Sequence, residues 1–133
     1  MMLDVLFLEV SMAKDDYDVI VFKVLLYYYA VLKRKILFEK ITFDKVIGTN
    51  DISEEYFIEV LLMMQEDGYI KNLAVKKAWG GDYILLSDFD EIKITSKGIE
   101  YLKENSKMQK VKEKILEFVD LASKLVQIVL TAN

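Results

Sequence analysis

The stretch that decides the fold is residues 53–105, which reads SEEYFIEVLLMMQEDGYIKNLAVKKAWGGDYILLSDFDEIKITSKGIEYLKEN. Ser53 is suited to cap a helix, and two glutamates follow it in the first turn, where carboxylates interact favourably with the helix dipole. Gly68 is placed to end that helix in the left-handed conformation, with the apolar Ile70 just beyond it. We therefore expect one helix between Ser53 and Gly68.

A small antiparallel sheet is predicted after this helix. The expected elements are a strand at residues 71–75, a hairpin tip at 76–82, a return strand at 83–86, a polar turn at 87–91 and a third short strand at 92–94. Thr95 is suited to cap a further helix that ends near Asn105. This order of helix, strand, glycine-containing tip, strand and helix is the signature of a winged helix-turn-helix domain. The predicted fold class is therefore α+β, with a small antiparallel sheet.

A long helix is predicted before this stretch, at residues 16–35. Acidic residues stand at its start and the basic run at residues 33–35 stands at its end, which suits the helix dipole. The helix contains three successive tyrosines at residues 27–29, and only one or two of them can face the same side. We interpret the triplet as core and rim packing, and a stacking surface for nucleic-acid bases is the alternative.

Between the two long helices the sequence predicts two short elements. Residues 38–41 are interpreted as a short strand of the kind that precedes the second helix of a winged helix. Thr42 is suited to cap a short helix at residues 43–47, and Gly48 is placed to end it.

The composition narrows the classes of function. The chain has 133 residues, enough for one domain with a hydrophobic core, and it contains no cysteine and no histidine. Disulfides and thiol chemistry are thereby excluded, and the commonest general base and metal ligand is missing. Asp88, Asp90 and Glu91 lack the glycine and the distal glutamate of a calcium loop, so a solvated turn is the favoured interpretation. We expect no enzymatic activity, no cofactor and no bound metal.

The charge is distributed unevenly along the chain. The net charge is −4, but residues 1–67 carry 13 acidic and 7 basic side chains, whereas residues 68–133 carry 9 acidic and 11 basic side chains. A protein that binds polyanions in general is basic overall. Any surface for nucleic acid is therefore expected to be local and to lie in the second half of the chain.

The first residues are expected to stand apart from the domain. Residues 1–15 are interpreted as an N-terminal extension, because their apolar run contains Asp4 and Glu9 and is too short to cross a bilayer. Residues 16–133 are expected to form a single winged-helix domain. We expect no membrane segment and a cytoplasmic location.

A second long helix is predicted at residues 108–131. Apolar residues there alternate at spacings of three and four, which is typical of a heptad seam. The seam begins at Met108, and its candidate dimer residues are Val111, Ile115, Phe118, Ala122, Leu125 and Val129. Packing against the first helix of the same chain is one interpretation. The breadth of the apolar stripe favours the other, a homodimer through this C-terminal helix.

Two motifs carry a resemblance to a known family. They are Gly68-Tyr69-Ile70 and the block ITSKGIEYLKEN at residues 94–105. On these motifs the chain resembles, over residues 17–130, the YjcQ-like family of small winged-helix proteins from Gram-positive bacteria and their phages. The resemblance implies a winged-helix fold and a prophage origin, and it supplies no activity and no site residues.

DNA binding is the first hypothesis for the function. A recognition helix reads bases with its N-terminal half, but here that half carries Glu54, Glu55 and Glu59, which the phosphates of DNA repel. Contact with double-stranded DNA is therefore expected from the hairpin and its surroundings. The candidate residues are Lys71, Lys76, Lys77, Trp79, Lys93 and Lys97. A flexible basic tip with an aromatic ring fits a DNA-binding wing, and a solvated hairpin with Trp79 packed back on the sheet is the alternative.

Protein binding is the second hypothesis. The candidate residues form an acidic stripe with one apolar member, and they are Glu55, Glu59, Met63 and Glu66. Such a stripe would face a basic host or phage protein, because an acidic face reproduces the charge of phosphate. A merely solvated helix face is the alternative. We favour a phage-derived, non-enzymatic regulator that binds DNA through its wing, with a protein-binding module as the second choice.

Overall fold

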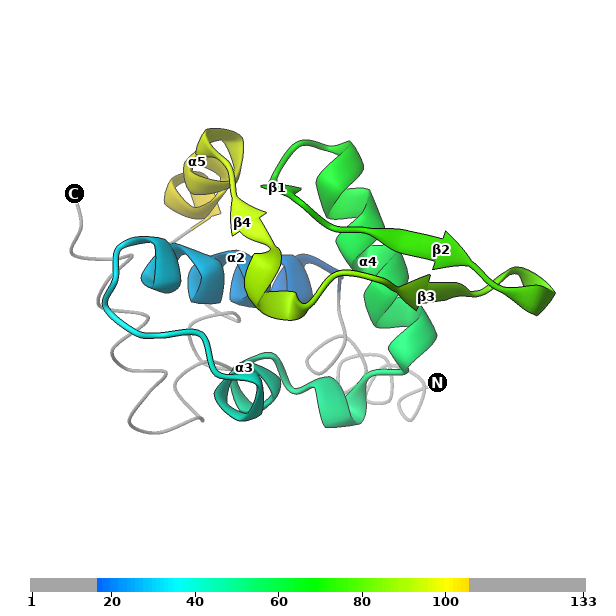
Figure 1. Ribbon diagram of the computed structural model, residues 1–133. Helices are drawn as coiled ribbons and strands as arrows, with labels where there is room; N and C mark the ends of the chain where they lie inside the picture. The colour runs from blue at the N-terminus through cyan, green and yellow to red at the C-terminus, as the bar shows by residue number, and fades with distance from the viewer. Residues whose placement is uncertain (1–16, 106–133) are drawn as a thin grey trace, which may run out of the picture.

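Helix α2 (Tyr17–Leu32) is the central element in the computed structural model, which describes residues 17–105 (Figure 1). Every side chain from Val19 to Tyr28 is buried. A helix that is apolar on nearly all sides needs cover on all sides. Two of the three successive tyrosines, Tyr27 and Tyr28, belong to the core, and Tyr29 lies half-buried at its rim. The packing interpretation of the triplet is therefore confirmed.

Helix α2 ends at Leu32, three residues earlier than predicted. Arg34 takes a left-handed conformation with φ of 58°. The Arg34 N–H donates to the Val31 carbonyl (3.0 Å) and the Lys35 N–H donates to the Ala30 carbonyl (3.0 Å), which is the bonding of a Schellman cap. The basic run thus closes the helix instead of extending it.

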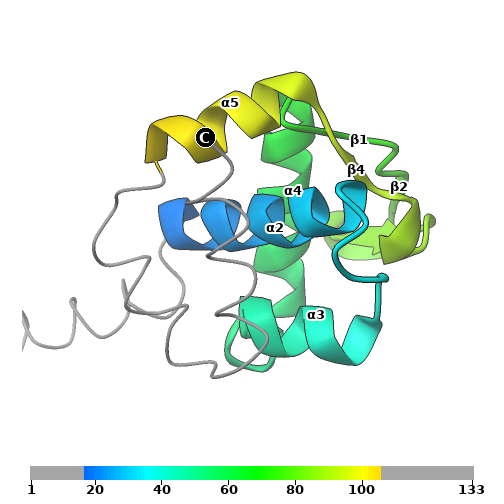
Figure 2. The ribbon, with the colours of Figure 1, turned by 90° about the vertical axis from the view of Figure 1, so that its left-hand side faces the viewer.

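Three helices and one strand make the most extensive contacts with α2. They are α3 (Lys40–Ile47), α4 (Glu54–Glu66), α5 (Ser96–Asn105) and strand β4 (Lys93–Ile94). Figure 2 shows α5 and α3 on opposite sides of α2, with α4 crossing it. The 3₁₀ turn η1 (Thr49–Asp51) connects α3 to α4, so these two helices form the helix-turn-helix unit.

The strand predicted at residues 38–41 is wrong, because α3 already begins at Lys40. The Tyr27 hydroxyl donates to the Glu39 carbonyl (3.2 Å) and accepts the Glu39 N–H (3.1 Å), so a side chain takes both groups that a neighbouring strand would bond. The residue that precedes the helix is Glu39, not Thr42. The Thr42 hydroxyl lies in the first turn and donates to the Glu39 carboxylate (2.6 Å).

The predicted C-terminal end of α3 and both predicted ends of α4 are confirmed. Gly48 has φ of 80° and ends α3, and the Ser53 hydroxyl accepts the Tyr56 N–H (3.2 Å) at the start of α4. Beyond α4, the Gly68 N–H donates to the Gln65 backbone carbonyl (3.0 Å) and the Tyr69 N–H donates to the Met64 carbonyl (2.8 Å). This is the Schellman cap that the glycine predicts.

The predicted sheet is present as two separate antiparallel ladders. Strand β1 (Ile70–Lys71) pairs with β4, and β2 (Val75–Lys77) pairs with β3 (Tyr83–Leu85). The single strand predicted at residues 71–75 is therefore wrong in its bounds. Asn72, with φ of 73°, turns the chain out of the first ladder, and the chain enters the second ladder at Val75.

The side chain of Gln65 on α4 takes the place of a neighbouring strand at this break. Its carbonyl oxygen accepts the Leu73 N–H (2.8 Å), and its amide group donates to the Leu73 carbonyl (3.0 Å). One residue later, the Ser87 hydroxyl accepts the Ala74 N–H (3.0 Å). The two Gln65 bonds attach the base of the β2–β3 hairpin to α4, and the Ser87 bond joins the two sides of that base.

The sequence motif at residues 94–105 joins the start of α5 to the end of α4. The Thr95 hydroxyl donates to the Gly68 carbonyl and accepts the Gly98 N–H (3.1 Å), which confirms the predicted cap. Gly98 has no room for a side chain. A Cβ atom there would collide with the Tyr69 carbonyl oxygen and would lie 2.7 Å from Cγ1 of Ile94. The motif therefore has a structural explanation.

The N-terminal extension predicted at residues 1–15 and the helix predicted at residues 108–131, with its candidate dimer residues, lie outside the described residues. Within residues 17–105, none of the helices has the length and apolar character that crossing a membrane requires.

Candidate nucleic-acid interface

The β2–β3 hairpin projects from the body of the fold in the manner of a wing (Figure 1). Its register pairs Val75 with Leu85, Lys76 with Ile84, and Lys77 with Tyr83. Successive side chains of a strand point to opposite faces, so the two lysines project to different sides of the hairpin. Both lysines are exposed. The hairpin therefore presents positive charge on each of its faces.

Trp79 stands at the tip of the wing with its side chain fully exposed (100%). The Ala78 N–H donates to the Asp82 carbonyl (2.6 Å) and closes the tip. Gly80 and Gly81 then turn the chain with φ of 87° and 92°, which glycine adopts without steric cost. The interpretation of Trp79 as packed back on the sheet is wrong, because the tip extends past the last strand pair and leaves the indole in solvent.

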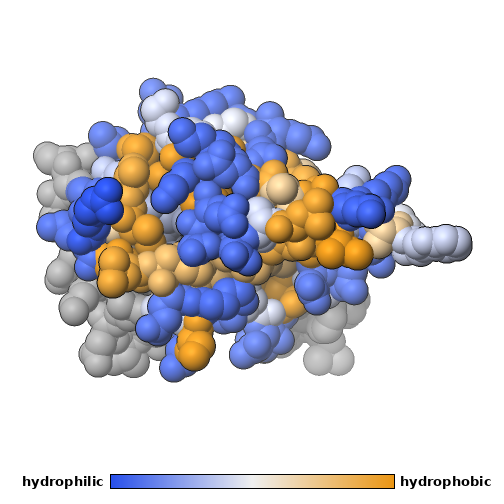
Figure 3. Space-filling model, in the orientation of Figure 1, coloured by the Kyte–Doolittle hydropathy of each residue, from blue (hydrophilic) through white to orange (hydrophobic). Residues whose placement is uncertain are grey.

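One face of the wing combines a lysine with apolar side chains. Lys76 and Ile84 are directly opposed and share this face, and Leu86 follows two residues after Ile84. Ile84 is 53% exposed and Leu86 is 62% exposed. Figure 3 shows an apolar area on the hairpin, next to hydrophilic side chains and the pale tip. The wing therefore offers contact area as well as charge.

The other three candidate lysines gather at the smaller ladder. Lys71 on β1 and Lys93 on β4 are directly opposed, and both are exposed. Like charges in this position repel each other. Lys97, also exposed, lies in the first turn of α5 with its Nζ 5.7 Å from the ring centroid of Tyr69. The six candidate residues thus form two groups, one on the wing and one on the β1–β4 ladder with α5.

Helix α4, in the position of a recognition helix, is acidic where a DNA-reading helix needs donors. Its first turn carries Glu54 and Glu55, and both are exposed. The predicted protein-binding stripe of Glu55, Glu59, Met63 and Glu66 is exposed along its whole length. Met63, at 38%, is the apolar member of the stripe.

The carboxylates of Asp88, Asp90 and Glu91 lie within 4.8 Å of one another and are exposed. Asp90 and Glu91 belong to the turn η3 (Phe89–Glu91), and Asp88 is the residue that caps its start. The Asp88 side chain accepts the backbone N–H of Glu91, and the Glu91 carboxylate accepts the Asp88 N–H (3.4 Å). This reciprocal capping explains why acidic residues occupy two of the three positions.

A feature that the sequence did not predict is an aromatic hollow between α3, the start of α4 and η3. It has two adjoining parts of about 390 and 320 Å³, which share Lys40 and Phe89. The first part is also lined by Phe38, Asp88 and Asp90. The second part is also lined by Asp44, Thr49, Asn50, Ile52, Glu54 and Phe57. No regular spacing connects these residues, so no sequence pattern indicated the hollow.

The floor of the aromatic hollow is continuous with the core. The rings of Phe89 and Phe43 have centroids 5.4 Å apart, and Phe38 stacks on Tyr28 at 5.9 Å. The Tyr28 hydroxyl donates to the Phe89 carbonyl (2.7 Å). Burial raises the pKa of Tyr28 far above its usual value, and the charges of Tyr27 and Asp90 add to the rise. Phe89 is therefore held from below by a neutral, buried phenol.

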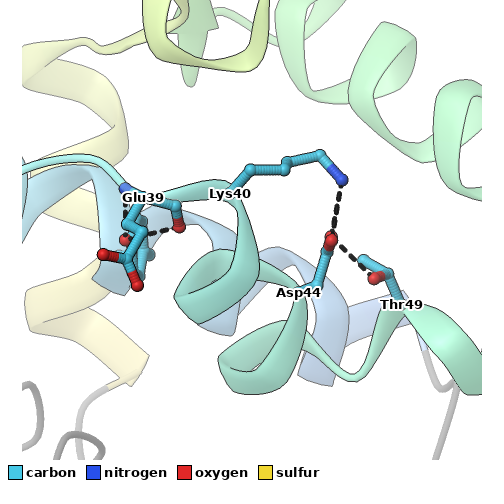
Figure 4. A network of polar contacts seen from close by, with 5 residues as sticks. Glu39, Lys40, Asp44 and Thr49 are labelled. Atoms are coloured by element: carbon cyan, nitrogen blue, oxygen red, sulfur yellow. Dashed lines mark hydrogen bonds and ion pairs between the residues drawn. The ribbon is translucent and has the colours of Figure 1, made fainter.

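An ion pair occupies the rim of the aromatic hollow. The Lys40 ammonium lies 2.8 Å from both carboxylate oxygens of Asp44 and 4.8 Å from the ring centroid of Phe89. Figure 4 shows Lys40 and Thr49 directed at Asp44 from two sides, and the Thr49 hydroxyl donates to that carboxylate (2.8 Å). The hollow thus already holds a cation between a carboxylate and an aromatic ring.

The helix-turn-helix unit and the projecting hairpin define a winged-helix-like α+β protein. The model of the family described as "YjcQ protein" matches residues 29–121. This match covers well over half of the chain, so the protein belongs to the YjcQ family. No curated protein and no solved structure matches the chain.

Proposed function

We propose that this protein is a non-enzymatic regulator of phage type that binds double-stranded DNA through its wing. The observation that carries the proposal is the projecting hairpin with Lys76, Lys77 and a fully exposed Trp79. Lysines supply affinity for phosphates without reading sequence, and an aromatic ring at a flexible tip can contact the sugar or base edges of a groove. Lys71, Lys93 and Lys97 would add phosphate contacts beside the wing.

The experiment is a fluorescence-anisotropy titration of the full chain with random duplex DNA at several salt concentrations. Lys76→Gln together with Lys77→Gln is expected to weaken binding and to lower the slope of log affinity against log salt by about 2. Lys45→Gln with Lys103→Gln is the matched control, because it removes the same charge from α3 and α5. Trp79→Ala should weaken binding without changing the slope.

Two results would contradict DNA binding through the wing. One is the absence of binding even at low salt. The other is equal weakening by the wing variant and by the matched control, because this would show that only net charge matters.

Protein binding through α4 is the second candidate function. It is favoured by the exposed stripe in which Met63 lies among three glutamates. Such a face suits a basic host or phage protein. Glu55→Lys with Glu59→Lys should abolish capture of that partner by the immobilised protein, whereas the wing variants should capture it normally. Retention by the charge-reversed variant would exclude the stripe.

We propose further that the chain acts as a homodimer through its C-terminal helix. The heptad seam contains Phe118 and Leu125 at core positions of a coiled coil. Phe118→Lys with Leu125→Lys should change the mass in solution, measured by light scattering, from twice to once the chain mass. An unchanged mass would contradict this interface.

A further inference from the structure

The aromatic hollow contains an arrangement that DNA binding by the wing does not use. Its rim places a cation, the Lys40 ammonium, against the Phe89 ring at 4.8 Å and against both oxygens of Asp44 at 2.8 Å. A ring face and a carboxylate are the two surroundings that stabilise a cation as it leaves water. The hollow is therefore built to receive positive charge with an apolar stem.

The negative charge around the hollow exceeds what Lys40 balances. Asp44, Glu54, Asp88 and Asp90 line its two parts, and Lys40 is the one basic residue among the residues that line them. The Lys40 side chain is itself half exposed (50%). An exposed ion pair of this kind contributes little to stability, so Lys40 can leave at small cost.

We propose that the aromatic hollow binds an arginine side chain of a partner protein, which displaces Lys40. A guanidinium group is planar, stacks on aromatic rings, forms paired bonds to a carboxylate and is more weakly hydrated than an ammonium group. Phe89 supplies the ring and Asp44 the carboxylate. The combined volume of the two parts lies in the range of pockets that hold small ligands.

This site is distinct from the wing and from the glutamate stripe that begins at Glu55. It lies where η3 packs beside the helix-turn-helix unit, and its lining residues come from α3, η1, the start of α4 and η3. A carboxylate-lined hollow in this position repels DNA phosphates and attracts a basic segment of a protein. The proposal therefore stands independently of the DNA-binding proposal.

The test is a titration of the isotope-labelled full chain with the peptide acetyl-Gly-Arg-Gly-amide, followed by the amide shifts of Asp44, Thr49 and Asp90. Shifts at these positions that saturate are expected. The same peptide with citrulline in place of arginine keeps the shape and lacks the charge, so it should bind at least about fivefold more weakly. Equal shifts with both peptides would overturn the proposal.

Two variants separate a binding site from a solvated acidic face. Lys40→Met removes the resident cation and should raise the affinity for the arginine peptide by about threefold. Lys45→Met is the matched control, because it removes the same charge from the exposed side of the same helix and should leave the affinity within about 1.5-fold. Equal affinities of the two variants would show that only net charge attracts the peptide.

A third variant tests the ring. Phe89→Leu keeps the backbone carbonyl that Tyr28 bonds, so the turn is retained, and it should lower the affinity for the arginine peptide by about threefold. An unchanged affinity would overturn the stacking geometry, and the spectrum of the free variant reports whether the fold is intact.

Discussion

At the scale of the residue, Tyr28 connects the central helix to the turn η3. Its hydroxyl donates to the Phe89 carbonyl at 2.7 Å, and the residue is 3% exposed. The same carbonyl accepts only one long backbone bond besides, from the Ile92 N–H at 3.4 Å. Tyr28 therefore satisfies a distant backbone group that the turn cannot satisfy well by itself.

Tyr28→Phe is expected to lower the free energy of unfolding by about 1 kcal/mol at neutral pH, because the Phe89 carbonyl loses its shorter bond. Urea unfolding followed by circular dichroism measures the loss. Tyr29→Phe, on the same helix but half-buried, is the control and should cost less. Equal losses for both variants would show that the hydroxyl bond contributes nothing.

The pH dependence of stability has a definite sign for this residue. Burial raises the pKa of Tyr28 in the folded protein above its usual value of about 10. Above pH 10 the unfolded chain loses this proton and the folded chain keeps it, so stability falls with rising pH, by up to about 1.4 kcal/mol per pH unit for one such group. The wild type should therefore lose stability more steeply than Tyr28→Phe between about pH 10 and 11. Parallel curves would contradict this.

Among the described glycines, Gly98 has the least room for a side chain. Gly98→Ala should destabilise the protein by about 2–4 kcal/mol, because the new methyl group meets the Tyr69 carbonyl and the Ile94 side chain. The midpoint of urea unfolding measures the effect. Glu100→Ala, two residues further on the exposed side of α5, is the control and should stay within about 0.5 kcal/mol of the wild type.

At the scale of the element, the wing is positioned by helix α4 rather than by the sheet. The chain leaves the β1–β4 ladder at Lys71, and both backbone groups of Leu73 then bond to the Gln65 amide. Leu73 itself lies in neither ladder, whereas its neighbour Ala74 is bonded by Leu86 and Ser87 on the other side of the hairpin. The Gln65 amide therefore forms a direct hydrogen-bonded link between α4 and the base of the wing.

Gln65→Ala is expected to cost about 2 kcal/mol of stability, because it leaves two backbone groups without partners. It should also raise the hydrogen-exchange rates of the β2–β3 amides more than those of α2. Glu66→Ala, the next and exposed residue, is the control. Uniform changes in exchange across the fold would show that Gln65 acts only on global stability.

The elements predicted well from the sequence were those with local signals. Ser53, Gly68 and Thr95 mark helix ends, and each acts through bonds to residues nearby or through a glycine conformation. The strand assigned to residues 38–41 failed because Tyr27, from another helix, takes the backbone bonds of Glu39. That contact is tertiary, and no periodicity in a short apolar run distinguishes the two outcomes.

The candidate site was predicted unevenly for the same reason. The charge of the wing is visible in the sequence because Lys76, Lys77 and Trp79 are contiguous. The full exposure of Trp79 was not predictable, because tryptophan usually buries most of its surface. The aromatic hollow was missed altogether, because Lys40 and Phe89 come together only through the packing of α3 against η3.

At the scale of the whole molecule, α2 is the helix that each of the other described α-helices contacts. Leu25 is fully buried in α2, and its Cδ2 atom faces the start of α5 near Gly98. Because α3, α4 and α5 all pack on one helix, none of them has a core of its own. The described fold is therefore expected to unfold as one unit.

Leu25→Ala should lower the free energy of unfolding by about 2–5 kcal/mol. The loss of helix and the loss of the near-ultraviolet tyrosine signal should still coincide in a single transition. Two separated transitions would show that part of the fold is stable without α2. Leu37→Ala, at a side chain that is 88% exposed, is the control and should have little effect.

The position of Trp79 makes the chain its own optical reporter. It is the single tryptophan among 133 residues, and its indole touches solvent on every side. Its emission should hardly change when the core unfolds. Tryptophan fluorescence would therefore stay constant through an unfolding experiment. This insensitivity to unfolding is useful when a partner is added, because a shift or quenching of the emission then reports binding at the tip of the hairpin. The measurement needs no added dye or label.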